Sequence, residues 1–189
     1  MAITKPILGK WITLRCAEES DAEFTLAIRN DLKLTKFIPK VNGDIESQKY
    51  WIRKQREKYG DYFFIIENKS HNSVGTISCY DFDYENNICE GGRYISYGDS
   101  IENIEAMLLL YDFIFIEQKF STIVMNVDEN NRKVLSIHKK FGAKYQKTIK
   151  LNDWVSKQYF LSKSDYFKRR EKLFGILQSK KLLSPFEII

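Results

Sequence analysis

Few side chains in this sequence suit acid–base chemistry at neutral pH. The chain has two histidines, His71 and His138, and neither belongs to an H-E-x-x-H zinc pattern. His138 falls on the apolar stripe of a predicted helix, where it could be a hydrogen-bonded core residue or a proton donor with a pKa near neutrality. Glu90 starts a predicted strand, where it could accept a proton from an attacking ammonium group or be an ordinary carboxylate at a strand edge. These residues favour proton transfer over metal-dependent hydrolysis.

A second group of chemically useful residues is acidic and lies in the middle of the chain. Residues 81–105 carry many more acidic than basic side chains, with Arg93 as their one basic residue. Such a region attracts a cationic amine and repels a phosphate backbone. Asp81 and Asp83 are therefore candidates to bind the ammonium group of a substrate.

Composition and missing motifs exclude several classes of protein. The chain has 189 residues, 43% of them hydrophobic and 29% charged, which suits one folded domain. No dinucleotide, Walker or G-x-S-x-G motif is present, which argues against hydride transfer, ATP hydrolysis and serine hydrolase chemistry. Three cysteines without a C-x-x-C pair make disulfides and zinc sites unexpected, so no metal is predicted.

Charge and hydropathy also limit where the protein can be located and what it can bind. The formal net charge of +5 comes from the segment after residue 156, because Lys and Arg balance Asp and Glu before it. This basic segment could be a nucleic-acid arm, but it has no repeated pattern of basic and aromatic residues that would cover a broad surface, and a solvated helix face is the simpler interpretation. No long apolar run or secretory signal is evident, so we expect a cytoplasmic protein without a membrane partner.

Hydrophobic periodicity predicts a mixed sheet flanked by helices. Asp99 and Glu102 have capping-box spacing, and Gly142 has the position of a helix C-cap. Tyr50, Trp51 and Ile52 are expected on the buried side of their helix. The expected elements are a strand at 11–15, a helix beginning near Asp21, a helix at 45–59, strands at 62–67, 74–82 and 88–96, a helix at 99–117, a strand at 121–127, a helix at 132–141, strands at 143–150 and 154–162 joined by a turn at Asn152 and Asp153, and a basic C-terminal helix.

Two glycines interrupt the strand at 88–96. Gly91 and Gly92 are adjacent inside a run that otherwise favours β-structure. Glycine inside a strand indicates a bulge or the close approach of another backbone. We therefore expect a backbone distortion at this pair.

Residues 90–142 resemble the core of the GNAT acetyltransferases. They read EGGRYIS, then the helix GDSIENIEAMLLLYDFIF, the strand STIVMNV and the helix NRKVLSIHKKFGA. The family motif N-x-x-(A/V)-(I/L)-x-(L/I)-(Y/H)-x-K-x-G is matched by Asn131, Val134, Leu135, Ile137, His138, Lys140 and Gly142. The flanking strands and helices extend the resemblance over about residues 11–165.

The resemblance implies a single α/β (α+β) domain over residues 1–165, with the basic segment 166–189 packed on it. It implies a mainly antiparallel sheet whose fourth and fifth strands splay apart, with acetyl-CoA lying in the opening and an amine attacking its thioester directly. The implied roles are polarisation of the thioester by backbone groups near Ile95 and Ser96, deprotonation of the amine by Glu90 and protonation of the leaving thiolate by His138. Asn131 is expected to bind the pantetheine arm, to cap its helix, or both.

The sequence departs from the family at the loop that usually holds the pyrophosphate. The family has an R/Q-x-x-G-x-G/A pattern there, whereas residues 97–103 contain one glycine and two acids. If Asp99 caps the helix, its carboxylate competes with phosphate for the same N–H donors. Gly98, Ser100 and Asn103 are the candidates to replace the missing loop.

The resemblance and the acidic middle segment lead to three functional hypotheses. The first is acetyl transfer from acetyl-CoA to a small amine, above all an amino sugar, either free or nucleotide-linked, because the acidic middle segment suits a cation and the helix pattern E-A-x-L-L-x-Y-D-F resembles an atypical branch associated with surface-sugar biosynthesis. A protein N-terminus or a polyamine is the alternative acceptor. The second is a degenerate GNAT fold that acts as a binding module without acetyl-CoA, and the third is a nucleic-acid binder. A homodimer is compatible with each of them.

Overall fold

The computed structural model describes residues 4–39, 42–151 and 154–177. The predicted turn at Asn152 and Asp153 and the end of the basic tail therefore lie outside the described residues. The chain divides into two compact units. Unit 1 comprises residues 1–82 and 91–112, and unit 2 comprises residues 83–90 and 113–189.

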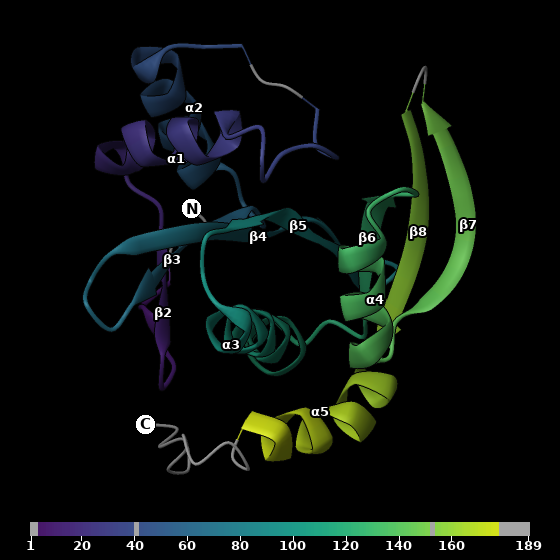
Figure 1. The fold of residues 1–189 in the computed structure, drawn as a ribbon. Coiled ribbons are helices and arrows are strands. Elements are labelled where there is room, and N and C mark those ends of the chain that lie inside the picture. Colours follow the sequence, from purple (N-terminus) through teal and green to yellow (C-terminus); the bar gives the residue numbers. More distant parts are fainter. Residues whose placement is uncertain (1–3, 40–41, 152–153, 178–189) are drawn as a thin grey trace. The chain divides into compact units, whose positions relative to one another are not determined.

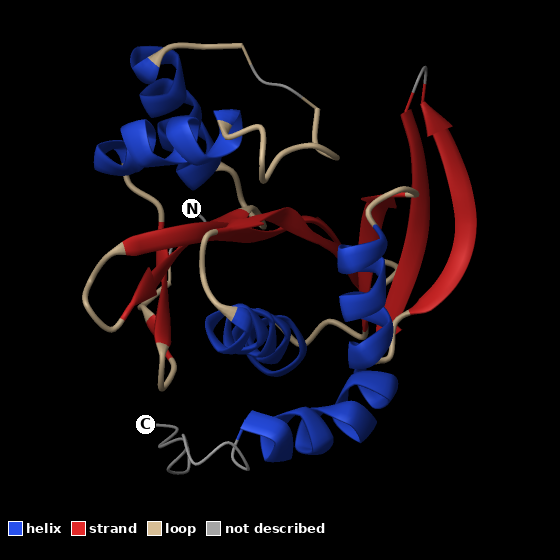
Figure 2. Ribbon diagram, in the orientation of Figure 1, coloured by secondary structure: helices blue, strands red, loops and turns tan. Residues whose placement is uncertain are grey.

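Unit 1 is a sheet with helices on both faces. Helices α1 and α2 lie on one face of its strands and α3 lies on the other (Figures 1 and 2). Neighbouring strands follow the order β1, β2, β3, β4, β5, and the pairings of β1 with β2, β2 with β3 and β3 with β4 are antiparallel. The elements are β1 (Ile7–Leu8), β2 (Ile12–Cys16), α1 (Ala22–Asn30), α2 (Ile45–Glu57), β3 (Tyr62–Asn68), β4 (Ser73–Asp83), β5 (Ile88–Ser96), which begins in unit 2, and α3 (Ser100–Asp112).

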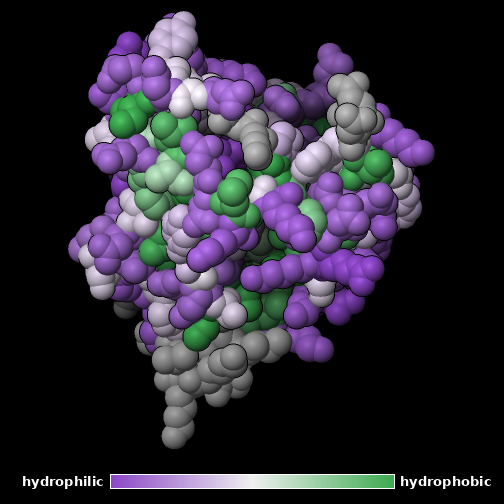
Figure 3. Space-filling view, turned by 45° about the horizontal axis from the view of Figure 1, so that its top comes forward, coloured by the Kyte–Doolittle hydropathy of each residue, from purple (hydrophilic) through white to green (hydrophobic). Residues whose placement is uncertain are grey.

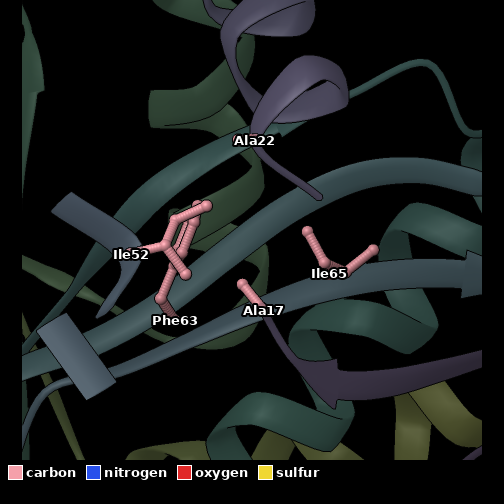
Figure 4. Packing of buried hydrophobic residues seen from close by; sticks show 5 residues of the cluster. All are labelled: Ala17, Ala22, Ile52, Phe63 and Ile65. Carbon is pink, nitrogen blue, oxygen red and sulfur yellow. The ribbon is translucent and has the colours of Figure 1, made fainter. Parts of the chain in front are cut away.

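The packing of α2 against β3 shows why β3 forms a central strand of unit 1. Ile52 of α2 packs with Phe63 and Ile65 of β3, and with Ala17 and Ala22 (Figure 4). The run from Phe63 to Ile66 is buried at every position, because helices cover both faces of the sheet. The prediction for α2 was wrong at two positions: Tyr50 is 57% exposed and Trp51 is 38% exposed. Successive helical residues point about 100° apart, so three in a row cannot share one buried face.

Unit 2 is built around a three-stranded antiparallel arrangement. β8 lies between β6 and β7 and pairs antiparallel with both of them. Its elements are a π-helical segment (Phe113–Glu117), β6 (Thr122–Asp128), α4 (Arg132–Phe141), β7 (Lys144–Leu151), β8 (Trp154–Ser162) and α5 (Lys163–Leu177). Gly142 ends α4 with φ +102°, as predicted, because a left-handed C-cap favours glycine.

The pairing of β5 with β6 is short. These strands are parallel and pair from Ile88 with Thr122 to Glu90 with Val124, within unit 2. β5 continues to Ser96 and β6 continues to Asp128, but the pairs between them end at Glu90. Counted from β2, these are the fourth and fifth strands, so the incomplete pairing that the resemblance implies for these two strands is confirmed.

The predicted distortion of β5 is present, but its form differs from the prediction. A Cβ on Gly92 would lie 2.5 Å from the hydroxyl of Tyr80, so the close neighbour is a side chain rather than another backbone. The left-handed backbone falls on the next residue, Arg93, with φ +51°. Glycine at 92 therefore makes room for Tyr80, and the positive φ of this strand falls on an arginine.

The order of the remaining helices and strands agrees with the order predicted from the sequence. Among the described residues, the sequence missed the two-residue β1, a short 3-10 turn (Glu19–Asp21) before α1, and the change from α-helix to π-helix at Phe113–Glu117. Asp21 does not cap α1 with its side chain and instead binds Arg15 through both carboxylate oxygens. Within the described ranges, no helix is both long and apolar enough to span a membrane. Hydrophilic residues dominate the face that Figure 3 shows.

Candidate functional site

The predicted site residues are distributed over both units, and each unit is described by itself. Unit 1 holds Asp81, Ile95, Ser96, Gly98, Ser100 and Asn103. Unit 2 holds Asp83, Glu90, Asn131 and His138.

The N-terminus of α3 carries the predicted capping box. The Asp99 carboxylate accepts hydrogen bonds from the backbone N–H groups of Ile101 at 2.7 Å and Glu102 at 2.9 Å. In return, Glu102 Oε2 accepts a hydrogen bond from the Asp99 N–H at 2.9 Å. Donors that a helix N-terminus would offer to a phosphate are thus already bonded to carboxylates.

The residues flanking this cap form a small polar cradle. The Gly98 N–H donates to Ser96 Oγ at 2.9 Å, and Asn103 Nδ2 donates to the Gly98 carbonyl at 2.8 Å. Asn103 Oδ1 is buried and accepts no hydrogen bond from the described residues. A Cβ on Gly98 would approach the Ser96, Glu102 and Asn103 side chains to 3.0–3.1 Å. An orphaned acceptor fits an amide N–H, such as those of the pantetheine arm of acetyl-CoA, but it does not fit a phosphate.

The end of β5 leads directly into this cradle. Ile95 is 5% exposed, and its carbonyl would lie 2.6 Å from a Cβ on Gly75 of β4. The N–H of Tyr97 donates to the Val74 carbonyl at 2.8 Å, which keeps this end of the strand against β4. Ser100 is exposed at the first residue of α3.

Glu90 belongs to a polar row in unit 2. Its Oε2 accepts a hydrogen bond from Asn126 Nδ2 at 2.9 Å, and Asn126 Oδ1 accepts one from Gln158 Nε2 at 3.1 Å. Glu90 is also the last β5 residue that pairs with β6. The carboxylate therefore sits where the two strands stop pairing, with its orientation set by Asn126.

Helix α4 carries the two remaining residues of unit 2. Asn131 caps the helix, since its Oδ1 accepts a hydrogen bond from the Val134 N–H at 3.3 Å. His138 is buried in the last turn of α4, and burial lowers its pKa to about 4. The imidazole is therefore neutral at pH 7 and has no imidazolium proton to give.

The two aspartates predicted to bind an ammonium group already have protein partners. Asp83 accepts hydrogen bonds from the backbone and side chain of Asn86, which lower its pKa and shape the turn between β4 and β5. Asp81 has a left-handed backbone and an exposed side chain 3.4 Å from Lys58 Nζ. Neither carboxylate is buried against an apolar wall, so substrate binding by them stays a prediction.

Sequence reasoning missed a cavity of about 470 Å³ in unit 1. Its lining includes Trp51, Phe63 and two arginines, Arg29 and Arg93. The arginines are 64 positions apart in α1 and β5, and no local pattern links them. An arginine directly after a glycine pair inside a strand was the one available signal.

Other reactive side chains are placed as ordinary core residues. Cys79 and Cys89 are buried free thiols, and burial raises the pKa of Cys89 to about 12. A thiol in that state is inert at neutral pH, as expected for a small core residue. In the described part of the chain, no group of three or more His, Cys, Asp or Glu could hold a metal ion.

Comparison with known proteins identifies the family. The pattern of the GNAT acetyltransferase domain matches residues 12–144, and the chain belongs to this family. It is accordingly an acetyl-CoA-dependent N-acetyltransferase by class. Comparison with curated proteins gives no significant match.

Similar solved structures differ widely in their sequence identity to this chain. Apo FdhC, described as a nucleotide-linked sugar GNAT, is 30% identical, with a TM-score of 0.76 over 96% of this chain and 100% of its own. A GCN5-related N-acetyltransferase from Brucella melitensis is 12% identical, with a TM-score of 0.78 over 90% of this chain and 84% of its own. Spermidine N-acetyltransferase from Vibrio cholerae, solved with CoA and spermine, is 16% identical, with a TM-score of 0.75 over 84% and 99%. The last two likenesses concern the fold alone.

Proposed function

We propose that this protein acetylates the primary amine of an amino sugar that is linked to a nucleotide. The observation that carries the proposal is the 30% identity to a nucleotide-linked sugar GNAT over nearly the whole of both chains. The spermidine enzymes share the fold at much lower identity, so they give little support to a polyamine acceptor. We place the reaction in the cytoplasm.

The acetyl group would pass directly from the thioester to the amine, with Glu90 as the base. An ammonium group must lose a proton before its nitrogen can attack a carbonyl carbon. Glu90 is the carboxylate at the last pair of β5 and β6, and Asn126 orients it. We assign it to take this proton, directly or through water.

The cofactor would be held by backbone and amide groups. Backbone groups near Ile95 and Ser96 are assigned to the thioester carbonyl and Asn131 to the pantetheine arm, as the family resemblance implies. The orphaned Oδ1 of Asn103 supports amide binding at the start of α3, beside Gly98 and Ser100. His138 would act through its neutral N–H, as a hydrogen-bond donor to the departing thiolate, because its pKa is too low for an imidazolium.

An acceptor panel tests the proposal. The panel contains a nucleotide-linked amino sugar, the same free amino sugar, spermidine and a peptide with a free N-terminus, each incubated with acetyl-CoA. The released CoA thiol is measured, and the product is identified by mass. We expect the highest kcat/KM for the nucleotide-linked sugar. Activity confined to spermidine or to the peptide would overturn the acceptor assignment.

One observation favours a second function, a binding module that no longer uses acetyl-CoA. The cap formed by Asp99 and Glu102 occupies N–H groups that a pyrophosphate would need. Thermal unfolding with CoA separates the two functions, because a ligand that binds only the native state raises Tm. No rise at millimolar CoA would favour the module.

A further inference from the structure

The cavity in unit 1 has a chemical character that none of the predicted site residues explains. It opens among α1, α2 and strands β3 to β5, and Trp51 and Phe63 form an aromatic wall with ring centroids 5.2 Å apart. Thr25, Ser47 and Thr76 add hydroxyl groups. Among its described lining residues, the only charged side chains are Arg29 and Arg93. An apolar wall with a few converging polar groups is typical of a small-molecule site.

Arg93 is held in a fixed position. Its two terminal nitrogens donate to the two carboxylate oxygens of Asp61, which is 3% exposed. Its guanidinium lies over the rings of Tyr80 at 4.1 Å and Trp51 at 5.3 Å. A left-handed backbone at a residue other than glycine is strained, and such strain tends to gather at ligand sites. Arg93 is therefore preorganised, with its charge balanced by one carboxylate.

Arg29 has no such balance. Its Nη2 donates to the Pro39 carbonyl at 3.2 Å, which is a neutral partner. Its Nε is buried and donates to no atom of the described residues. Burial and the nearby charge of Arg93 both lower its pKa. A buried N–H donor on a half-buried guanidinium is costly unless a ligand supplies an acceptor.

The charges around the cavity favour an anion. Arg29 and Arg93 face it, and Asp61, bonded to Arg93, also lies within ion-pair distance of Lys58. One cationic guanidinium is thus left without a protein carboxylate among the described residues. Guanidinium groups bind phosphate through paired N–H bonds, and an aromatic wall accepts a flat ring or a sugar face. A polyamine would instead place its own cations beside two arginines.

We propose that this cavity binds a phosphate group of the acceptor substrate, with Arg29 as the main anion ligand and Arg93 as the second. The assignment deepens the proposed function and rests on it. The phosphate of a nucleotide-linked sugar enters between the two guanidinium groups, and Trp51 contacts the adjoining ring. CoA also carries phosphates, so the experiment has a separate arm for it.

Calorimetric titration with UDP, inorganic pyrophosphate and CoA tests the site on the full chain. The wild type is compared with Arg29→Gln, Arg29→Lys and the control Arg53→Gln, which removes an exposed arginine of α2 paired with Glu19. We expect Arg29→Gln to weaken UDP binding at least about tenfold, Arg29→Lys to weaken it less, and the control and CoA affinity to stay unchanged. Thermal unfolding of each variant shows that it is folded.

The following binding results overturn the inference. One is the failure of UDP and pyrophosphate to bind the wild type at millimolar concentration, and another is binding of UDP to Arg29→Gln as tight as to the wild type. An equal loss of CoA affinity in Arg29→Gln would assign the phosphate to the cofactor. A different result tests the proposed function. If UDP binding depends on Arg29 but no amine is acetylated, the anion site stands and the acceptor assignment is wrong. If Arg29→Gln acetylates the sugar with an unchanged KM, the acceptor assignment stands and the anion site is ruled out.

Discussion

The Asp99 carboxylate lies 2.9 Å from the backbone nitrogen of Glu102 and occupies a donor at the N-terminus of α3. Its second backbone partner is Ile101, at 2.7 Å. A negative charge in the first turn stabilises a helix, but it also excludes a second anion from the same donors. This pair is where the chain differs most clearly from the usual GNAT loop.

Replacing Asp99 with alanine should change stability and cofactor affinity in opposite directions. Loss of the cap should lower the free energy of unfolding by about 1 kcal/mol. The freed N–H groups and the loss of a negative charge should strengthen CoA binding roughly threefold to tenfold. Calorimetry and urea unfolding measure the two effects.

The control is Asp44→Ala, because Asp44 caps α2 in the same way through the Ser47 N–H. It should lower stability and leave CoA affinity unchanged. If Asp99→Ala also leaves CoA affinity unchanged, the pyrophosphate does not use the N-terminus of α3.

Glu90→Gln tests the proposed base. The amide keeps nearly the same shape and can still accept from Asn126, but it cannot take a proton at neutral pH. We expect kcat to fall about 100-fold with little change in KM. Steady-state kinetics from pH 5 to 9 provides the measurement. Glu85→Gln, in the exposed turn before β5, is the matched control, and an equal effect of both changes would remove Glu90 from the mechanism.

His138 predicts a loss of stability in mild acid. Because burial lowers its pKa from 6.5 to about 4, the folded state binds the proton less well than the unfolded state. The contribution of neutral His138 is complete above pH 6.5 and is lost as the pH falls toward 4, by roughly 2–3 kcal/mol. Urea unfolding at several pH values should show this slope in the wild type and a flatter one in His138→Phe. His71→Phe changes an exposed histidine and should keep the steep slope; equal slopes in all three proteins would contradict the assignment.

The sequence predicts most elements of this fold because their signals are local. The cap formed by Asp99 and Glu102 and the glycine that ends α4 each depend on residues within a few positions of each other. The cavity could not be predicted, because Arg29 and Arg93 meet only through tertiary packing. The exposure of Trp51 was missed for a different reason: three successive residues of a helix cannot share one buried face, and the expectation for α2 ignored this periodicity. The low pKa of His138 required its burial to be known.

Glu105 gives a prediction about what holds α3 in unit 1. Its side chain is buried and accepts hydrogen bonds from the backbone N–H groups of Lys10, Trp11 and Ile12 at 2.7–2.8 Å, across more than 90 positions of sequence. In Glu105→Gln the amide nitrogen would face N–H donors, so at least one buried group loses its partner. We expect the free energy of unfolding to fall by about 1–3 kcal/mol, measured by urea unfolding. Glu23→Gln, on the exposed face of α1, should have almost no effect. An unchanged unfolding midpoint in Glu105→Gln would mean that the carboxylate is not what fixes the turn between β1 and β2 to α3.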